Sequence, residues 1–244
     1  MPQRSRTSMI GWLCFAAGLF LLGRSGVSAP AEQAGYSPVV SPPPLHAFLQ
    51  SNLKLVQGWL DDKDYVSAAE ATQGLVTLAQ LYAYQGAEPA WQRRCSALQE
   101  ECSRLMQAAR RKSAADCEKS TRECGRLLEE LAKTPPAGDK ARAENFKTPG
   151  STKTMMLLMD GAYADAKSSR KTAEVEQLAQ AIAELSNASA HLRREAAWKQ
   201  ATDEVRDLAL KAAGLARGDD PAPAKVALKE MYRRCEKCHT SYKR

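Results

Sequence analysis

Two helix-forming segments that resemble one another constrain the fold of this 244-residue chain. Each is about 90 residues long, which is enough for one small domain, and is rich in the strong helix formers Ala, Leu, Glu, Lys, Arg and Gln. They align at an offset of 107 residues, which becomes 111 toward their C-terminal ends. We interpret them as two copies of one unit. The aligned pairs are Leu49 with Met156, Gln73 with Gln180, Leu75 with Ile182, Leu78 with Leu185, Trp91 with Trp198, Arg122 with Arg233 and Cys124 with Cys235.

Turn signals divide each copy into four helices with short loops, a pattern typical of antiparallel neighbours. We therefore expect an all-α chain with two tandem antiparallel four-helix bundles, over residues 45–132 and 153–244. A proline-rich tether at 32–44 should precede the first bundle, and a linker at 133–152 should follow it. The expected helices are 45–61, 65–85, 88–111 and 113–132 in the first copy, and 153–168, 171–193, 195–216 and 222–243 in the second.

Residues 1–31 have the pattern of a secretory signal peptide. Arg4 and Arg6 precede an apolar run over 9–23, and small residues follow at 28–31. The run is shorter than the roughly 20 residues that span a membrane, so we expect cleavage and a periplasmic or otherwise exported protein. An uncleaved anchor is the alternative. The net charge of +7 becomes +4 without this segment, because it holds three arginines and no acidic residue. Such a charge suits an acidic protein partner and does not indicate nucleic acid.

Near the C-terminus, Cys235, Cys238 and His239 form a Cys-x-x-Cys-His run. This is the attachment signature of a c-type haem, in which two thiols bind the haem covalently and the histidine ligates the iron. A redox dithiol is one alternative, but no strand is expected nearby. Half of a zinc site is another, and it would need two more ligands. We expect one haem c per chain.

A helical bundle with this motif at the end of its last helix resembles the cytochrome c′ family. The resemblance covers about residues 152–244 with the motif and 45–132 without it. It rests on Trp198 and on the run 235–242. It implies that His239 is the proximal iron ligand and that the first helix of the second copy faces the opposite side of the haem.

Family members carry at that opposite position either an apolar residue, which leaves the iron five-coordinate, or a methionine that ligates it. Here Met156 is the expected ligand, with Met155 and Met159 as alternatives. Core filling is the other common use of such methionines. The chain departs from the family at Thr152, where members carry an arginine. His191 is a further candidate ligand, although a histidine at a helix end commonly interacts with the helix dipole.

The first copy has lost the motif, because Leu127 and Leu128 stand where the second thiol and the histidine would be. We expect this bundle to be free of haem and its cavity to be filled by side chains.

Four cysteines of the first copy instead suggest disulfides. Cys95 and Cys102 share a helix face, as do Cys117 and Cys124. If the hairpin between these helices turns near residues 110–111, Cys95 lies opposite Cys124 and Cys102 opposite Cys117. An exported protein favours oxidation, so we expect disulfides Cys95–Cys124 and Cys102–Cys117. Four free thiols or a four-thiolate zinc site are the alternatives.

Together these features predict a periplasmic monohaem electron carrier that docks a redox partner protein. No nucleophile–base pair or acidic dyad indicates an enzyme. The alternative is a cytochrome c′-like protein that binds nitric oxide or carbon monoxide at an open iron site. A third possibility is an interaction module whose haem-free bundle dimerises or docks a redox partner, or serves as an internal partner for the second bundle. Tyr232, Arg233 and Arg234 are candidates for contacts with the porphyrin edge.

Overall fold

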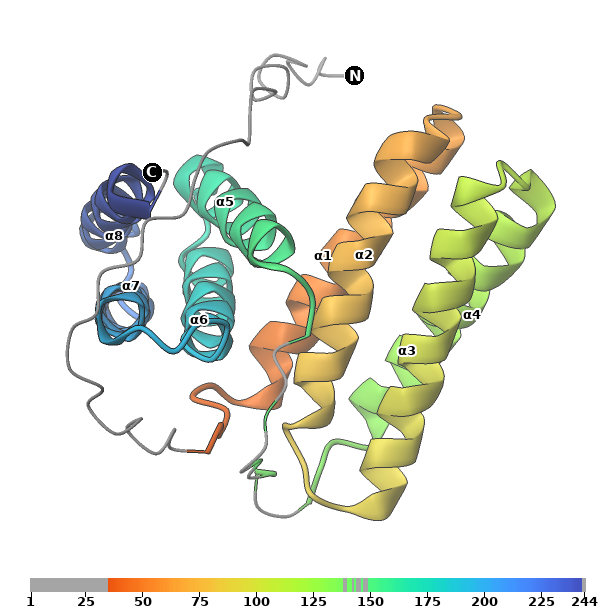
Figure 1. The fold of residues 1–244 in the computed structure, drawn as a ribbon, viewed down its shortest axis with the longest axis horizontal. Coiled ribbons are helices and arrows are strands. Elements are labelled where there is room, and N and C mark those ends of the chain that lie inside the picture. Colours follow the sequence, from red (N-terminus) through yellow and green to blue (C-terminus); the bar gives the residue numbers. More distant parts are fainter. Residues whose placement is uncertain (1–34, 138–139, 142, 144–145, 147–148, 243–244) are drawn as a thin grey trace, which may run out of the picture. The chain divides into compact units, whose positions relative to one another are not determined.

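The computed structural model describes residues 35–137, 140–141, 143, 146 and 149–242, and this part of the chain is all-α, as predicted. Apart from an isolated β-bridge between Tyr36 and Ala143, its regular structure is helical. Each helix coincides with an expected one, with ends shifted by a few residues. The helices are α1 (Pro42–Asp61), α2 (Tyr65–Ala83), α3 (Pro89–Arg110), α4 (Ala114–Lys133), α5 (Thr152–Ser168), α6 (Thr172–Ser189), α7 (Ala196–Leu215) and α8 (Ala222–Tyr242) (Figure 1).

Local sequence explains where several helices begin. The Asp64 carboxylate accepts a hydrogen bond from the Ser67 N–H at the start of α2, at 3.1 Å. The Ser151 hydroxyl does the same for the Thr154 N–H at the start of α5, at 3.2 Å. Such side chains satisfy N–H groups that have no partner within the helix. Proline occupies the first turn of α1 and α3, where a backbone donor is not needed.

The helices contact one another in two rings (Figure 1). In the first ring α1 and α3 each contact α2 and α4, and in the second α5 and α7 each contact α6 and α8. We call α1–α4 the first helix group and α5–α8 the second helix group. Buried side chains from both groups form the core. This contact pattern is compatible with the two expected four-helix bundles.

A tryptophan has the same role in both groups. The Trp91 indole N–H donates to the carbonyl of Ala83 at the end of α2, at 3.1 Å. The Trp198 indole N–H donates to the carbonyl of Ser189 at the end of α6, at 2.7 Å. Both side chains are buried. Each tryptophan thus ties the first turn of the third helix to the last turn of the second, which supports the interpretation of two copies.

Some described residues of the expected tether and linker pack against one another and against the helices. Tyr36 is fully buried, and its ring stacks on Phe146 with centroids 4.0 Å apart. Tyr36 and Ala143 exchange two backbone hydrogen bonds of 3.0 and 3.1 Å. The prolines at 42–44 belong to α1. Large aromatic side chains bury enough apolar surface to hold such segments in place, although no helical periodicity marks them.

A buried carboxylate joins this N-terminal segment to the second helix group. Glu184 of α6 is fully buried and accepts a hydrogen bond from the Tyr36 hydroxyl. Its other oxygen accepts from the N–H groups of Val39 and Val40, at 2.8 and 3.0 Å. Burial raises the pKa of Glu184, and these hydrogen bonds oppose the rise. The segment before α1 is therefore anchored on α6.

Contacts between the two groups involve equivalent helices. α1 contacts α6, and α5, the counterpart of α1, contacts α2, the counterpart of α6. At the second contact Leu158 packs so closely on Gly74 that a Cβ there would lie 2.9 Å from the leucine Cδ2. Reciprocal contacts of this kind are what two copies of one unit make when they pair about an approximate two-fold axis.

Among the described residues no helix is long and apolar enough to cross a membrane. The predicted signal peptide, residues 1–31, lies outside the described part of the chain.

Candidate haem-attachment site

The two thiols of the predicted motif lie on α8, one helical turn apart. Cys235 and Cys238 are both partly buried, and Cys235 packs against the apolar core. Position 239 follows on the same helix, but the side chain of His239 lies outside the described part of the chain. A single helix therefore presents both thiols with the spacing that the motif requires.

The surroundings of these thiols disfavour thiolate formation. Burial raises the pKa of Cys235 to about 12, and the nearby charge of Asp160 adds to this effect. Burial also raises the pKa of Cys238, while the Arg193 guanidinium opposes the rise. Redox dithiols of the Cys-x-x-Cys type have a thiol with a lowered pKa. The site therefore differs from a thioredoxin-like dithiol in its electrostatics as well as in its helical setting.

A pair of stacked rings sets the register of α5 against α8. The centroids of Tyr163 and Tyr232 are 4.5 Å apart and their planes differ by 10°. One turn further, Asp160 of α5 lies near enough to Cys235 to affect its pKa. The residue number falls along α5 as it rises along α8, so the two helices are antiparallel. The next turn places Met156 at the level of position 239.

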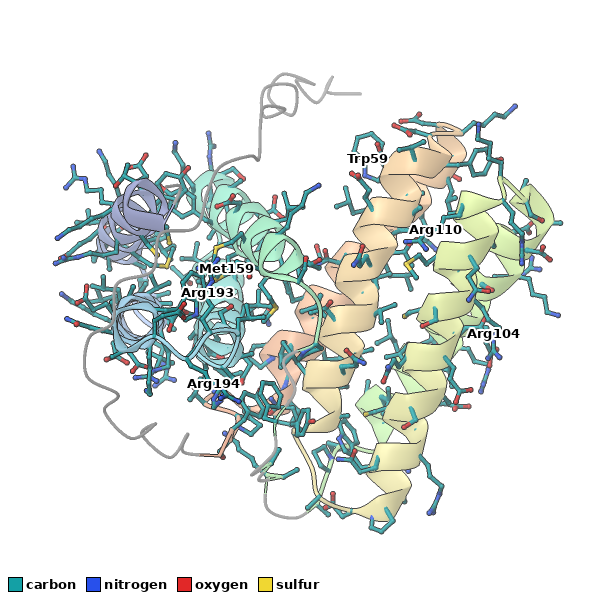
Figure 2. The ribbon with its side chains drawn as sticks, in the orientation of Figure 1. Trp59, Arg104, Arg110, Met159, Arg193 and Arg194 are labelled. Atoms are coloured by element: carbon teal, nitrogen blue, oxygen red, sulfur yellow. The ribbon has the colours of Figure 1, made fainter. Side chains whose placement is uncertain are left out.

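Helical periodicity separates the three candidate methionines. Met156 shares a stripe with Asp160 and Tyr163, the two residues that approach α8. Met155 and Met159 lie on the adjacent stripe and are buried, with exposed fractions of 0% and 6%. Met156 is only partly buried. Figure 2 shows Met159 and Arg193 within the second helix group.

His191 has a packing role in this structure. Its ring meets Tyr36 and Phe146 edge-on, at centroid distances of 5.8 and 5.2 Å. Burial lowers its pKa. The histidine therefore belongs to the aromatic cluster that holds the N-terminal segment, and no local sequence pattern indicates this setting. Arg193, two residues later, covers the Trp198 ring at 4.9 Å from its centroid.

On α4, the residues that correspond to the motif of α8 are buried. Cys124, Leu127 and Leu128 have exposed fractions of 1%, 8% and 2%, and all belong to the core, as does Leu49, the counterpart of Met156. In addition, the contact between α1 and α4 is more extensive than that between α5 and α8. Side chains thus fill the region in the first group that corresponds to the motif region of the second.

The cysteines of the first group are placed differently from the prediction. No bond joins any two of the four in the structure, and the sulfur atoms in contact are those of Cys102 and Cys124, with Sγ atoms 3.8 Å apart. Neither Cys95–Cys124 nor Cys102–Cys117 is brought together as a contacting pair. The reason is the position of the turn: α3 ends at Arg110 and α4 begins at Ala114, which moves the hairpin centre beyond residues 110–111.

Two residues near the motif were missed by sequence reasoning. Asp160 could have been found from its spacing of four residues after Met156, which places it on the same face of α5. Arg193 lies in the connection between α6 and α7, and its proximity to Cys238 depends on the tertiary fold. No local signal marks it.

Comparisons with protein-family models, with curated proteins and with solved structures found no match to this chain. Within the described residues no group of three or more His, Cys, Asp or Glu side chains is arranged to hold a metal ion.

Proposed function

We propose that this chain is an exported monohaem c-type cytochrome that transfers electrons, built as two tandem four-helix bundles of the cytochrome c′ type. Cys235 and Cys238 would hold the haem through thioether bonds, and His239 would be the proximal iron ligand. Met156 would be the ligand on the opposite side. When bound, the haem supplies a one-electron couple between ferric and ferrous iron.

The observation that carries the proposal is the pairing of two stripes across α5 and α8. Tyr232, Cys235 and position 239 share one face of α8, and Met156, Asp160 and Tyr163 share one face of α5. The tyrosine stack matches these stripes turn by turn. Met156 and position 239 would thereby lie at the same level on facing helices, which supports a site in which both side chains hold one haem.

The remaining surroundings fit a covalently held apolar cofactor. Burial raises the pKa of both thiols, which favours their protonated form at neutral pH, and neither has a disulfide partner among the described residues. The contact between α5 and α8 is less extensive than the equivalent contact between α1 and α4. The Arg193 guanidinium supplies a positive charge next to Cys238, where a haem carboxylate would be favoured.

Optical spectroscopy of three matched variants tests the proposal. Met156→Ala should abolish the far-red band of methionine-ligated ferric haem and open the iron to carbon monoxide. Met155→Ala and Met159→Ala should keep that band, because these side chains fill the core. A wild-type protein with high-spin, five-coordinate iron would instead support the gas-binding alternative. A protein that carries no haem would refute both.

A further inference from the structure

The four cysteines of the first helix group are not equivalent in the structure. Cys102 of α3 and Cys124 of α4 have exposed fractions of 1% each, and their sulfur atoms are in contact at 3.8 Å. Cys95 lies near Tyr82 of α2, whose pKa it affects. Cys117 lies near Arg111 and Asp116 at the opposite end of the hairpin. Only one pair among the four is thus placed for a bond between the helices.

We propose that Cys102 and Cys124 form an interhelical disulfide, while Cys95 and Cys117 remain thiols. The register of the hairpin supports this pairing. The loop between α3 and α4 spans residues 111–113, and Cys102 and Cys124 lie at equal sequence distances from Ser113. In the same register Cys95 is level with Leu131, and Cys117 is level with Ala109. The level of Cys95 and the level of Cys117 are therefore about 21 Å apart along the helix axis, at 1.5 Å per residue.

The bond requires a small approach of the two sulfur atoms, since a disulfide has an S–S distance of about 2.05 Å. The two thiols lose two protons and two electrons as the S–S bond forms. A disulfide-bonded oxidant, such as an oxidised dithiol protein or glutathione disulfide, accepts these electrons and is reduced to two thiols. Such oxidants are available to an exported protein, so formation of the bond in the cell rests on the proposed export.

The setting of the pair indicates when it can be oxidised. Contact with Cys102 and burial both raise the pKa of Cys124, and the neighbouring charges of Glu101 and Glu123 add to the rise. Thiolates are the reactive species, so the Cys124 thiol reacts slowly in the folded protein.

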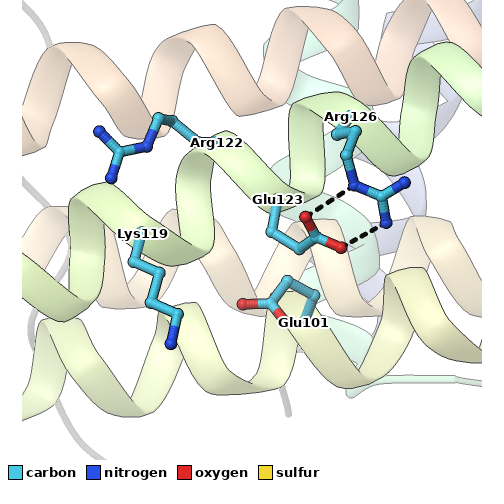
Figure 3. A pocket seen from close by; sticks show the side chains of 5 residues that line it. All are labelled: Glu101, Lys119, Arg122, Glu123 and Arg126. Carbon is cyan, nitrogen blue, oxygen red and sulfur yellow. Dashed lines mark hydrogen bonds and ion pairs between the residues drawn. The ribbon is translucent and has the colours of Figure 1, made fainter.

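The two acidic residues near Cys124, Glu101 and Glu123, line a surface groove between α3 and α4. There the Glu123 carboxylate pairs with Arg126 (Figure 3). We expect the bond to form during folding, before α3 and α4 pack together and bury the two thiols. Burial raises the pKa of Cys95 to about 12, so this thiol is unreactive as well.

Peptide mapping of the full-length mature chain tests the pairing. Reduced protein is unfolded, refolded in a glutathione redox buffer, alkylated and digested without reduction. Trypsin leaves Cys95 and Cys102 on one peptide, because no lysine or arginine separates them; a glutamate-specific protease cuts at Glu100 and Glu101 and does separate them. We expect a Cys102–Cys124 link and alkylated Cys95 and Cys117. A Cys95–Cys124 link, a Cys102–Cys117 link or four alkylated cysteines would overturn the proposal.

Thermal unfolding provides a second measurement. The disulfide would close the loop between Cys102 and Cys124. Oxidation should therefore raise Tm by roughly 5–10 °C. Cys102→Ser should abolish the difference between oxidised and reduced protein, and the matched variant Cys95→Ser should keep it. Equal behaviour of the two variants would contradict the pairing. If refolded protein forms the link but protein isolated from the cell has four thiols, the proposed export fails and the pairing stands.

Discussion

At equivalent levels of the two helix groups, the same helix positions carry different chemistry. In the first group Cys102 faces Cys124, with sulfur atoms 3.8 Å apart. The counterparts in the second group are Ala209 and Cys235, so only one of these two positions carries a thiol. The first pair is buried, whereas Cys235 is only partly buried. The first helix group thus has two thiols in contact at this level, whereas the second has only Cys235 there.

The neighbouring positions show the same contrast. Leu127 and Leu128 close the face of α4, while the matching residues of α8 are Cys238 and His239. The two helix groups are thus stabilised in different ways. The first is filled by apolar side chains at these positions, and the second carries Cys238 and His239 there. The groups can differ in this way because contacts within each group are more extensive than contacts between them.

The largest expected effect comes from the motif cysteines. Replacing Cys235 and Cys238 by serine should abolish covalently bound haem, because serine cannot form the thioether bonds. The matched variant Cys124→Ser, at the counterpart of Cys235, should retain the full amount. Haem staining of denatured protein after electrophoresis measures both. Loss of pigment in Cys124→Ser as well would break the contrast between the groups.

The carboxylate at the junction should have the next largest effect. Glu184→Ala leaves two buried donors and one partly buried donor without an acceptor and should lower the free energy of unfolding by roughly 3 kcal/mol. Its counterpart Thr77 makes one hydrogen bond, to the Gln73 carbonyl at 3.1 Å, so Thr77→Ala should cost about 1 kcal/mol. Urea denaturation measures both values. Equal losses would show that the two groups do not use this position differently.

The pH dependence of that site has a defined sign. Since the pKa of Glu184 is raised in the folded state, the native protein binds this proton more tightly than the unfolded chain. The resulting stabilisation is complete below the unfolded pKa of about 4.3 and declines as pH rises through the higher folded value. The stability of wild type relative to Glu184→Gln should therefore decrease between acidic and neutral pH. An increase over that range would mean that the hydrogen bonds outweigh burial.

Rebuilding the motif in the first group should destabilise it without creating a haem site. The double substitution Leu127→Cys and Leu128→His creates a Cys-x-x-Cys-His run that begins at Cys124. It also buries an imidazole where Leu128 is 2% exposed, which should cost about 2–3 kcal/mol. The haem absorbance should still correspond to one haem per chain. A second covalently bound haem would show that the first group has more room than its packing indicates.

The smallest effects are expected where the copies agree. Trp91→Phe and Trp198→Phe each remove one indole hydrogen bond to the end of the preceding helix. Each should lower the free energy of unfolding by about 1 kcal/mol. Because the two contacts are equivalent, the two losses should be similar. A large difference would argue against a common origin of the two groups.

The sequence predicted the helices well and the longer-range contacts less well. Helical periodicity and capping are local, so each helix boundary was expected to within a few residues. Tyr36 packs on Phe146, more than 100 residues away, and no pattern within 32–44 indicates this. The cysteine pairing failed for a simpler reason. A shift of a few residues in the centre of the α3–α4 hairpin exchanges the partner of Cys124, and turn position is the least certain part of a sequence-based prediction.

The most direct test of the account is mass spectrometry of the peptide that contains Cys235, Cys238 and His239, taken from protein secreted by a host able to attach haem c. The account predicts a peptide that carries one haem on both cysteines, and no haem on the peptide that contains Cys124. Unmodified thiols at Cys235 and Cys238, or a disulfide between them, would contradict it.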